Sequence, residues 1–300
     1  MIGPGGSRNP ARVASPDLIT GLRELAGRYD VLLCDVWGVI HNGRERFPAA
    51  CEALVRWGAE VGPVVLISNS PRPSPDVVFQ LRKLGVPEDA WSGFVTSGDV
   101  TRAELAARAP ARVWHVGAPR DRTLLEGIDL ERAGPQDADF VCVSGPEDDE
   151  TETAEDYRDR LQVCAARGLP LVCANPDRVV QRGDRLITCG GALADLYEGL
   201  GGEVVMAGKP FAPIYTATLA EADRLLGRPA DRARVLCVGD GLLTDVAGAN
   251  RAGLPLLFVT EGVHGPDMRA AEGGLDPDAA RRFLADAGAT ADHLIAELAW

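Results

Sequence analysis

The chain has 300 residues, with 31 Lys and Arg against 44 Asp and Glu, and a formal net charge of −13 at pH 7. This length fits two domains of ordinary size, each long enough to bury its own core. The acidic balance argues against nucleic acid as a partner, and the absence of any run of roughly 18 apolar residues argues against a membrane-spanning protein.

The N-terminal segment and the cysteines indicate where the protein works. Residues 1–15 are rich in Gly, Pro and Ser, so we expect them to be disordered. They lack the apolar stretch of a signal peptide, which favours a cytoplasmic protein. The seven cysteines form no C-x-x-C pair, and we expect them to be reduced and mostly buried.

From residue 16 onward, short apolar runs alternate with helical patterns. Near-continuous apolar runs are typical of strands covered on both faces, as in parallel sheets. The predicted strands are 31–35, 64–69, 93–98, 113–117, 139–145, 169–175, 235–240 and 254–260. The predicted helices are 48–60, 73–84, 100–108, 154–167, 211–226 and 244–252. This alternation predicts an α/β fold.

The segment between Ser68 and Lys209 is longer than one strand–helix–strand unit needs and carries its own strand and helix signals. We therefore predict an α/β module inserted into another. The expected core domain is 16–99 plus 204–300, and the expected inserted domain is 100–203.

Three carboxylates stand at expected strand ends. Asp35 follows one apolar run, and Asp240 and Asp245 lie on the turn after another. The carboxyl edge of an open α/β sheet is where ligands bind. Hard oxygen ligands gathered there favour Mg²⁺. A lone Asp after a strand is more often a turn or cap residue, so the prediction depends on the combination.

Polar groups suited to an anion follow the same pattern. Ser68 and Asn69 end a second run and offer a hydroxyl and an amide to anionic oxygens. Lys209 offers a compact charge suited to phosphate or to a neighbouring carboxylate. It is one of only two lysines, with Lys83, among 31 basic residues, so its place beside a proline at a strand end is informative.

Four segments together resemble a known family. DVWGV (35–39), LISNS (66–70), GKP (208–210) and VGDGLLTD (238–245) resemble, in this order, the four motifs of the haloacid dehalogenase superfamily. The insert between the second and third motifs resembles the NagD-like, nitrophenylphosphatase branch with its α/β cap (class IIA). The resemblance covers roughly residues 30–265 and implies a Rossmann-like parallel-sheet core with an inserted α/β cap domain.

The resemblance also implies a reaction, which is phosphoryl transfer through an aspartyl-phosphate at Asp35. Mg²⁺ would be held by Asp35, the backbone carbonyl of Trp37 and Asp240, with Asp245 orienting a bound water or Lys209.

The remaining implied roles concern the substrate, which would be a small phosphorylated molecule. Ser68 and Lys209 would hold its phosphoryl oxygens, and backbone amides near Gly38 and Asn69 would complete the phosphate site. Asn175 and Asp177, in the segment CANPD, face the substrate from the cap or form a turn. A cap-mediated homodimer is also implied.

One position departs from the family pattern. The family's phosphatases carry a second aspartate two residues after the nucleophile, where this chain has Trp37. An indole N–H does not exchange a proton near neutrality, so the usual general acid and base is missing. His41 could supply a proton, although a local turn residue is the stronger interpretation.

Two functions therefore stay open. One is a phosphatase that favours good leaving groups, and the other is a catalytically weak or inactive phospholigand-binding relative. An imine mechanism of the phosphonatase kind is disfavoured because the cap has no lysine. Metal-free dehalogenation is disfavoured because Asp240 and Asp245 are kept. The segment GDGLLT (239–244) resembles a dinucleotide-binding turn, but its third glycine is missing.

Overall fold

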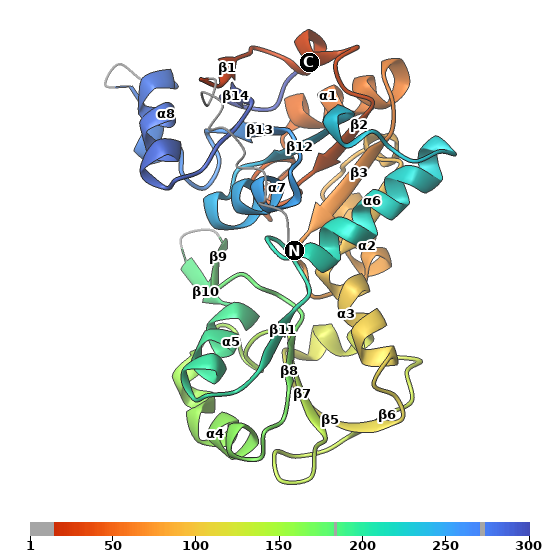
Figure 1. Ribbon diagram of the computed structural model, residues 1–300, viewed down its shortest axis with the longest axis vertical. Helices are drawn as coiled ribbons and strands as arrows, with labels where there is room; N and C mark the ends of the chain where they lie inside the picture. Colours follow the sequence, from red (N-terminus) through yellow and green to blue (C-terminus); the bar gives the residue numbers. More distant parts are fainter. Residues whose placement is uncertain (1–14, 183–184, 271–273) are drawn as a thin grey trace, which may run out of the picture.

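The computed structural model describes residues 15–182, 185–270 and 274–300. Residues 1–14, for which we predicted disorder, lie outside these ranges. Two parallel sheets, one above the other in Figure 1, organise the described chain. This arrangement confirms the predicted α/β fold with a Rossmann-like core and an inserted cap.

The larger sheet has the strand order β1-β14-β13-β12-β2-β3-β4, and each neighbouring pair is parallel. Its strands are β1 (Asp17–Leu18), β2 (Val31–Cys34), β3 (Val64–Ser68), β4 (Gly93–Thr96), β12 (Val235–Gly239), β13 (Leu256–Val259) and β14 (His293–Ile295). Strands β12, β2 and β3 are adjacent at its centre, so their carboxyl ends lie at one edge.

Helices cover both faces of this sheet because successive side chains of each strand point to opposite sides. Leu32 and Cys34 pack on one face with Trp57, whereas Val31 and Leu33 pack on the other. The first face is covered by α1 (Pro48–Glu60) and α2 (Ser74–Lys83). The second is covered by α6 (Ala212–Leu226), α7 (Ala247–Ala252) and α8 (Pro277–Asp286).

The smaller sheet has the order β11-β8-β7-β5-β6, again all parallel. Its strands are β5 (Ala111–Val116), β6 (Leu130–Arg132), β7 (Phe140–Val143), β8 (Leu171–Cys173) and β11 (Val204–Met206). One face packs against α4 (Arg158–Ala166) and α5 (Gly190–Gly199), and the other against α3 (Ser97–Ala106). After β8 the chain forms a separate antiparallel pair of strands, β9 (Val179–Arg182) and β10 (Arg185–Thr188).

The chain passes between the sheets through α3 and through the segment after β11 (Figure 1). Strand β11 pairs with β8, so the smaller sheet reaches Met206, slightly past the boundary of 203 that we expected. Helices α5 and α8 and strand β14 were not predicted, although α8 begins with Asp276 as its N-cap and with Pro277. All seven cysteines are buried, in agreement with the expectation from the sequence.

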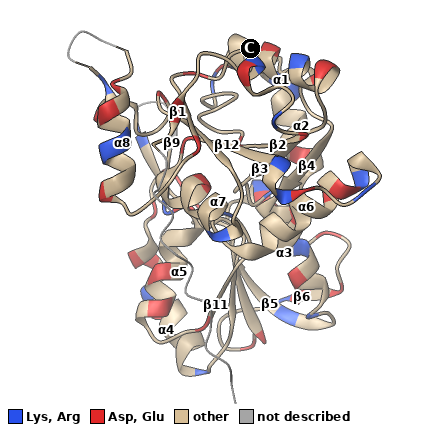
Figure 2. Ribbon diagram, turned by 45° about the horizontal axis from the view of Figure 1, so that its top comes forward, with Lys and Arg blue, Asp and Glu red and all other residues tan. Residues whose placement is uncertain are grey.

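The surface carries charges of both signs. Basic and acidic segments are interspersed on α1, α6 and α8 (Figure 2). Within the described ranges, every helix is too short or too polar to cross a bilayer.

Candidate active site

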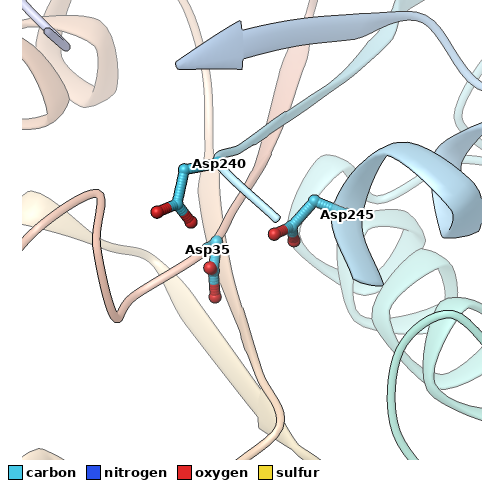
Figure 3. Close-up of side chains that lie close together, drawn as sticks. All are labelled: Asp35, Asp240 and Asp245. Carbon is cyan, nitrogen blue, oxygen red and sulfur yellow. The ribbon is translucent and has the colours of Figure 1, made fainter. Parts of the chain in front are cut away.

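Three buried carboxylates meet at the carboxyl edge of the larger sheet. Asp35 follows β2, Asp240 follows β12, and Asp245 lies in the π-helical turn Leu242–Val246 (Figure 3). One oxygen from each lies within 4.8 Å of the others, and all three residues are buried. The adjacency of β2 and β12 in the sheet brings together residues that are far apart in the sequence.

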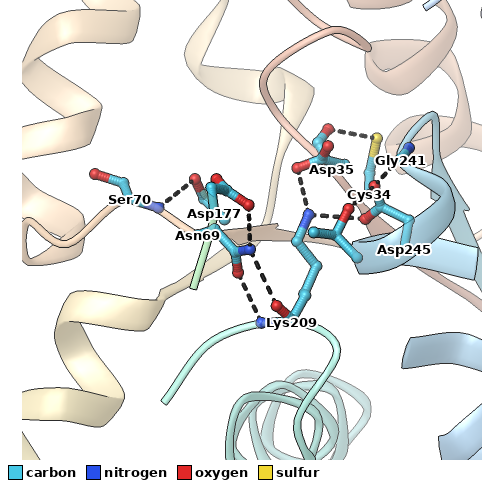
Figure 4. A network of polar contacts seen from close by, with 10 residues as sticks. Cys34, Asp35, Asn69, Ser70, Asp177, Lys209, Gly241 and Asp245 are labelled. Carbon is cyan, nitrogen blue, oxygen red and sulfur yellow. Dashed lines mark hydrogen bonds and ion pairs between the residues drawn. The ribbon is translucent and has the colours of Figure 1, made fainter. Parts of the chain in front are cut away.

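Lys209 lies between two of these carboxylates. Its Nζ donates to Asp35 Oδ1 at 2.6 Å and to Asp245 Oδ1 at 2.7 Å (Figure 4). Burial alone would lower the pKa of Lys209, but the carboxylates of Asp245 and Asp35 raise it above its ordinary value. The ammonium is therefore charged at neutral pH, and its side chain is only 2% exposed.

One ammonium cannot balance three carboxylates. Burial and the nearby Asp245 raise the pKa of Asp35 well above its ordinary value, although Lys209 opposes this. Burial and Asp245 likewise raise the pKa of Asp240 to about 7. A buried excess of negative charge on oxygen ligands fits a divalent cation, which would favour the ionised forms.

Two loops approach the same carboxylate oxygen of Asp240. The N–H of Val263 donates to Asp240 Oδ2 at 2.8 Å. A Cβ on Gly38 would lie 2.3 Å from the same oxygen, and one on Gly262 would lie 2.2 Å from it. Glycine at these two positions therefore lets backbone approach the carboxylate closely.

The turn after β12 orients Asp245 through its own backbone. The N–H of Gly241 donates to Asp245 Oδ2 at 3.1 Å, while Oδ1 accepts from Lys209. The two oxygens of this carboxylate are thus committed to different partners. Its direction is fixed before any ligand binds.

Trp37 packs against its own loop. Its ring meets the His41 ring edge-on, with centroids 5.1 Å apart. A Cβ on Gly43 would lie 2.3 Å from Trp37 Cη2, and Gly43 has a φ of +85°. Both the close approach of the Trp37 ring and the left-handed backbone favour glycine at this position. The Gly38 N–H donates to the His41 carbonyl at 2.8 Å. That amide has an acceptor within the loop, and its expected phosphate-binding role stays a prediction.

His41 is poorly placed to replace the missing acid. Its Nδ1 accepts from the Gly43 N–H at 2.9 Å, and the side chain is buried. Burial lowers the pKa of His41 to about 4, so the imidazole is neutral at pH 7. These contacts agree with the interpretation of His41 as a turn residue.

Ser68 ends β3, the strand next to β2, and Asn69 follows it. Both are buried, and Ser68 Oγ accepts from the Ser70 N–H at 3.2 Å. The Asn69 side chain is occupied by contacts to Lys209 and Asp177. Asn69 therefore connects protein segments through its amide side chain, and the expected phosphate-binding role of the backbone amides near it stays a prediction.

The cap contributes Asp177 to this neighbourhood. Asp177 Oδ1 accepts from Asn69 Nδ2 at 2.8 Å. Burial raises the pKa of Asp177, although the hydrogen bond from Asn69 opposes the shift. Asn175 instead holds the local turn, because its Oδ1 accepts from the Asp177 N–H at 3.1 Å.

The sequence-predicted residues therefore fall into two groups. Asp35, Lys209, Asp240 and Asp245 share direct contacts or close approach. The others lie in the segments around them: Trp37, Gly38, His41, Ser68, Asn69, Asn175 and Asp177. Sequence reasoning did not find the supporting residues Gly43, Gly262 and Val263. The glycines in the segments HNG (41–43) and EGV (261–263) could have suggested tight loops, but the sequence does not show that these loops pack against Trp37 and Asp240.

Comparison with known proteins agrees with this geometry. A model described as haloacid dehalogenase-like hydrolase matches residues 32–131, and a HAD-hydrolase-like model matches residues 206–287. A crystal structure of a haloacid dehalogenase-like hydrolase from Brucella suis 1330 is 45% identical, with a TM-score of 0.83, over 94% of this chain and 100% of that chain.

Named enzymes are more distant. The 5'-nucleotidase YutF of Bacillus subtilis is 28% identical over 78% of this chain and 88% of its own length. The ribonucleotide monophosphatase NagD of Escherichia coli K12 is 27% identical over 79% of this chain and 89% of its own length.

Proposed function

Because this chain belongs to the haloacid dehalogenase-like hydrolases, in the NagD-like branch with an α/β cap, we propose that it is a Mg²⁺-dependent phosphatase with Asp35 as its nucleophile. Its similarity to known phosphatases indicates that it is a phosphoric monoester hydrolase. The observation that carries the proposal is the contact of Lys209 with Asp35 and Asp245, beside Asp240.

The metal would be held by Asp35, Asp240 and the Trp37 carbonyl, with Asp245 beside them. Bound Mg²⁺ would offset repulsion between the nucleophile and the phosphate dianion and stabilise charge on the phosphoryl oxygens. Lys209 and Ser68 would bind phosphoryl oxygens directly. The close packing of Gly38 and Val263 on Asp240 supports this metal position, since it fixes one ligand in advance.

The reaction divides into two displacements. A carboxylate oxygen of Asp35 attacks phosphorus, the ester P–O bond breaks, and the leaving oxygen takes the electron pair. Water then attacks the same phosphorus, the bond to Asp35 breaks, and the carboxylate is restored. The protons of that water end on inorganic phosphate and on the released oxygen or solvent.

Trp37 sets the range of substrates in this proposal. No acidic side chain stands at that position, and His41 is neutral, so the leaving oxygen departs without a proton from either residue. General acid–base assistance is worth about 10²–10⁴ in rate. Aryl and acyl phosphates should therefore react well. Small phosphorylated metabolites with poor leaving groups, including the nucleotides suggested by the names of YutF and NagD, should react slowly.

The proposal is tested with a panel of phosphoesters assayed with Mg²⁺. We expect nitrophenyl phosphate to exceed nucleotide and sugar phosphates in kcat/KM, and Asp35→Asn to abolish turnover of both. Turnover that survives Asp35→Asn would reject the nucleophile. Equal rates on both classes would mean that another group protonates the leaving oxygen.

Position 37 gives a matched pair of variants. Trp37→Asp should raise kcat on sugar and nucleotide phosphates by about 10²–10⁴, whereas Trp37→Phe, which keeps an aromatic ring beside His41, should not. Turnover gained only with Trp37→Asp would favour the second candidate, a phospholigand-binding relative that Trp37 has silenced.

The proposal also includes the setting of the enzyme. We place it in the cytoplasm, acting on a small phosphorylated molecule, as a homodimer joined through the cap. Sedimentation of the full chain measures the oligomeric state, and a monomer at all concentrations would remove that part of the proposal.

A further inference from the structure

One buried side chain joins the cap to the segment that carries the catalytic lysine. Asn69 Nδ2 donates to Asp177 Oδ1 at 2.8 Å and to the Lys209 carbonyl at 3.1 Å. Asn69 Oδ1 accepts from the Lys209 N–H at 2.7 Å (Figure 4). Asn69 belongs to the core, Asp177 belongs to the cap, and Lys209 follows the last cap strand.

These contacts fix the orientation of the Asn69 amide. A backbone N–H must meet the amide oxygen, and a carboxylate must meet the amide nitrogen, so the side chain has one arrangement that satisfies its partners. Both hydrogens on Nδ2 are used, one by each acceptor. Removal of the Asp177 acceptor would leave a buried donor unmatched.

Close packing shows that the cap lies directly on this point. A Cβ on Gly208 would lie 2.5 Å from Asn69 Oδ1, 2.8 Å from Ser97 Oγ and 2.9 Å from Pro176 Cδ. Pro176 precedes Asp177, so cap and core segments meet at the residue before Lys209. A movement of the cap here must disturb the surroundings of that lysine.

We propose that Asn69 and Asp177 form a latch that holds the Lys209 backbone in its catalytic position only while the cap is seated. Asp177 fixes Asn69, Asn69 fixes the N–H and carbonyl of Lys209, and the ammonium is then aimed at Asp35 and Asp245. Asn69 and Asp177 are positioning residues that act through Lys209. This inference rests on the proposed function, in which Lys209 binds the phosphoryl group.

The latch has a consequence for substrate choice. A molecule too bulky for the cap to seat over it would meet a lysine that lacks its backbone support. Such a substrate would lose kcat as well as affinity, because the support is needed during the reaction. The latch therefore couples the fit of the leaving group under the cap to phosphoryl transfer.

The test compares Asp177→Ala, Asp177→Ser, Asp177→Asn and the control Asp159→Ala in the full chain. Asp159 is an exposed carboxylate on α4 of the same domain. Hydrogen exchange is measured at the Lys209 amide, and kcat is measured with nitrophenyl phosphate and Mg²⁺. The exchange measurement needs no turnover, so it decides on the latch even if the proposed function fails.

We expect Asp177→Ala and Asp177→Ser to speed exchange at Lys209 and to lower kcat by about 10- to 100-fold, the range for a lost bond to a charged group. Asp177→Asn should restore both, because its amide oxygen also accepts from Asn69, and Asp159→Ala should change neither. Unchanged exchange at Lys209 in both short variants would overturn the latch. A kcat that stays low in Asp177→Asn despite restored exchange would overturn it too, in favour of proton transfer by Asp177.

Discussion

Lys209 is one of two lysines in the chain, and the two have opposite surroundings. Lys209 is buried between Asp35 and Asp245, whereas Lys83 is exposed on α2 with its ammonium 4.3 Å from the centre of the Phe79 ring. Removal of one partner from a buried ion pair leaves an uncompensated charge. The two lysines thus provide an internal comparison of buried and exposed charge.

Lys209→Met should destabilise the metal-free protein by about 3–5 kcal/mol near neutral pH, because two buried carboxylates lose their cation. Lys83→Met should change stability by less than about 0.5 kcal/mol. The loss in Lys209→Met should shrink at acidic pH, since protonation neutralises the carboxylates. Chemical denaturation at two pH values measures both variants, and equal losses for the two lysines would contradict this account.

Strand ends explain only part of the candidate site. Asp35 and Asp240 were placed together because neighbouring parallel strands of one sheet deliver their carboxyl ends to the same edge. Lys209 follows β11, which belongs to the smaller sheet, so strand order alone does not account for its contacts with Asp35 and Asp245. The sequence could not show that the Asn69 amide donates a hydrogen bond to Asp177, which lies 108 positions away. Such partners depend on how the cap docks, and no local pattern records that contact.

At the scale of elements, the loop after β2 brings the backbone of Gly38 close to the Asp240 carboxylate. Gly38 has a φ of +87° and lies against Asp240, while Gly127 has a φ of +75° with nothing within 4 Å of a Cβ. Alanine at either position incurs the strain of a left-handed conformation, about 1–2 kcal/mol. Only at Gly38 would the added methyl also displace Asp240, which we propose as a metal ligand.

Gly38→Ala and Gly127→Ala should therefore share the strain of the left-handed conformation but differ in metal binding. We expect the Mg²⁺ dissociation constant to rise at least tenfold in Gly38→Ala and to stay unchanged in Gly127→Ala. Isothermal titration with Mg²⁺ measures both. Equal metal affinity in the two variants would show that the approach of Gly38 to Asp240 is unimportant.

Long elements with clear periodicity were predicted well. Helix α1 begins and ends at the predicted residues 48 and 60, and its apolar face covers the sheet. Helix α5 was missed because it begins with Gly190 and Gly191, which weaken a helical pattern. A Cβ on Gly191 would lie 2.1 Å from the Pro176 carbonyl oxygen. Packing therefore requires glycine at this position, although glycine disfavours a helix.

At the scale of the whole molecule, the excess negative charge at the candidate active site links stability to pH and to metal. An Asp whose pKa is raised in the fold contributes its full stabilisation at pH values below its unfolded pKa of about 4. That contribution is lost as pH rises through about 7, the pKa of Asp240. Without a divalent cation, the site therefore opposes folding increasingly as the carboxylates ionise.

Mg²⁺ should raise the melting temperature more at pH about 8 than at pH about 5.5, because the ion competes with protons for Asp240 and Asp35. Scanning calorimetry with Mg²⁺ and with a chelator measures the difference at each pH. In Asp240→Asn the Mg²⁺ effect should largely disappear. The same Mg²⁺ effect at both pH values would contradict the charge account of the site.

The architecture was also foreseeable at this scale, but its boundary was only approximate. The length of the segment between Ser68 and Lys209 predicted an inserted domain. The placement of β11 in the smaller sheet depends on pairing with β8, a contact between segments more than a helix apart. Three residues at the end of an apolar stretch do not reveal which sheet they join.

The central claim is that Asp35 carries the phosphoryl group during turnover. Enzyme mixed with nitrophenyl phosphate and Mg²⁺ is quenched in acid and digested, and the modified residue is located by mass spectrometry. We expect a phosphoryl group on Asp35, which builds up because Trp37 cannot activate the hydrolytic water, and none in Asp35→Asn. Steady turnover with no phosphoryl group on Asp35 at any quench time would contradict it.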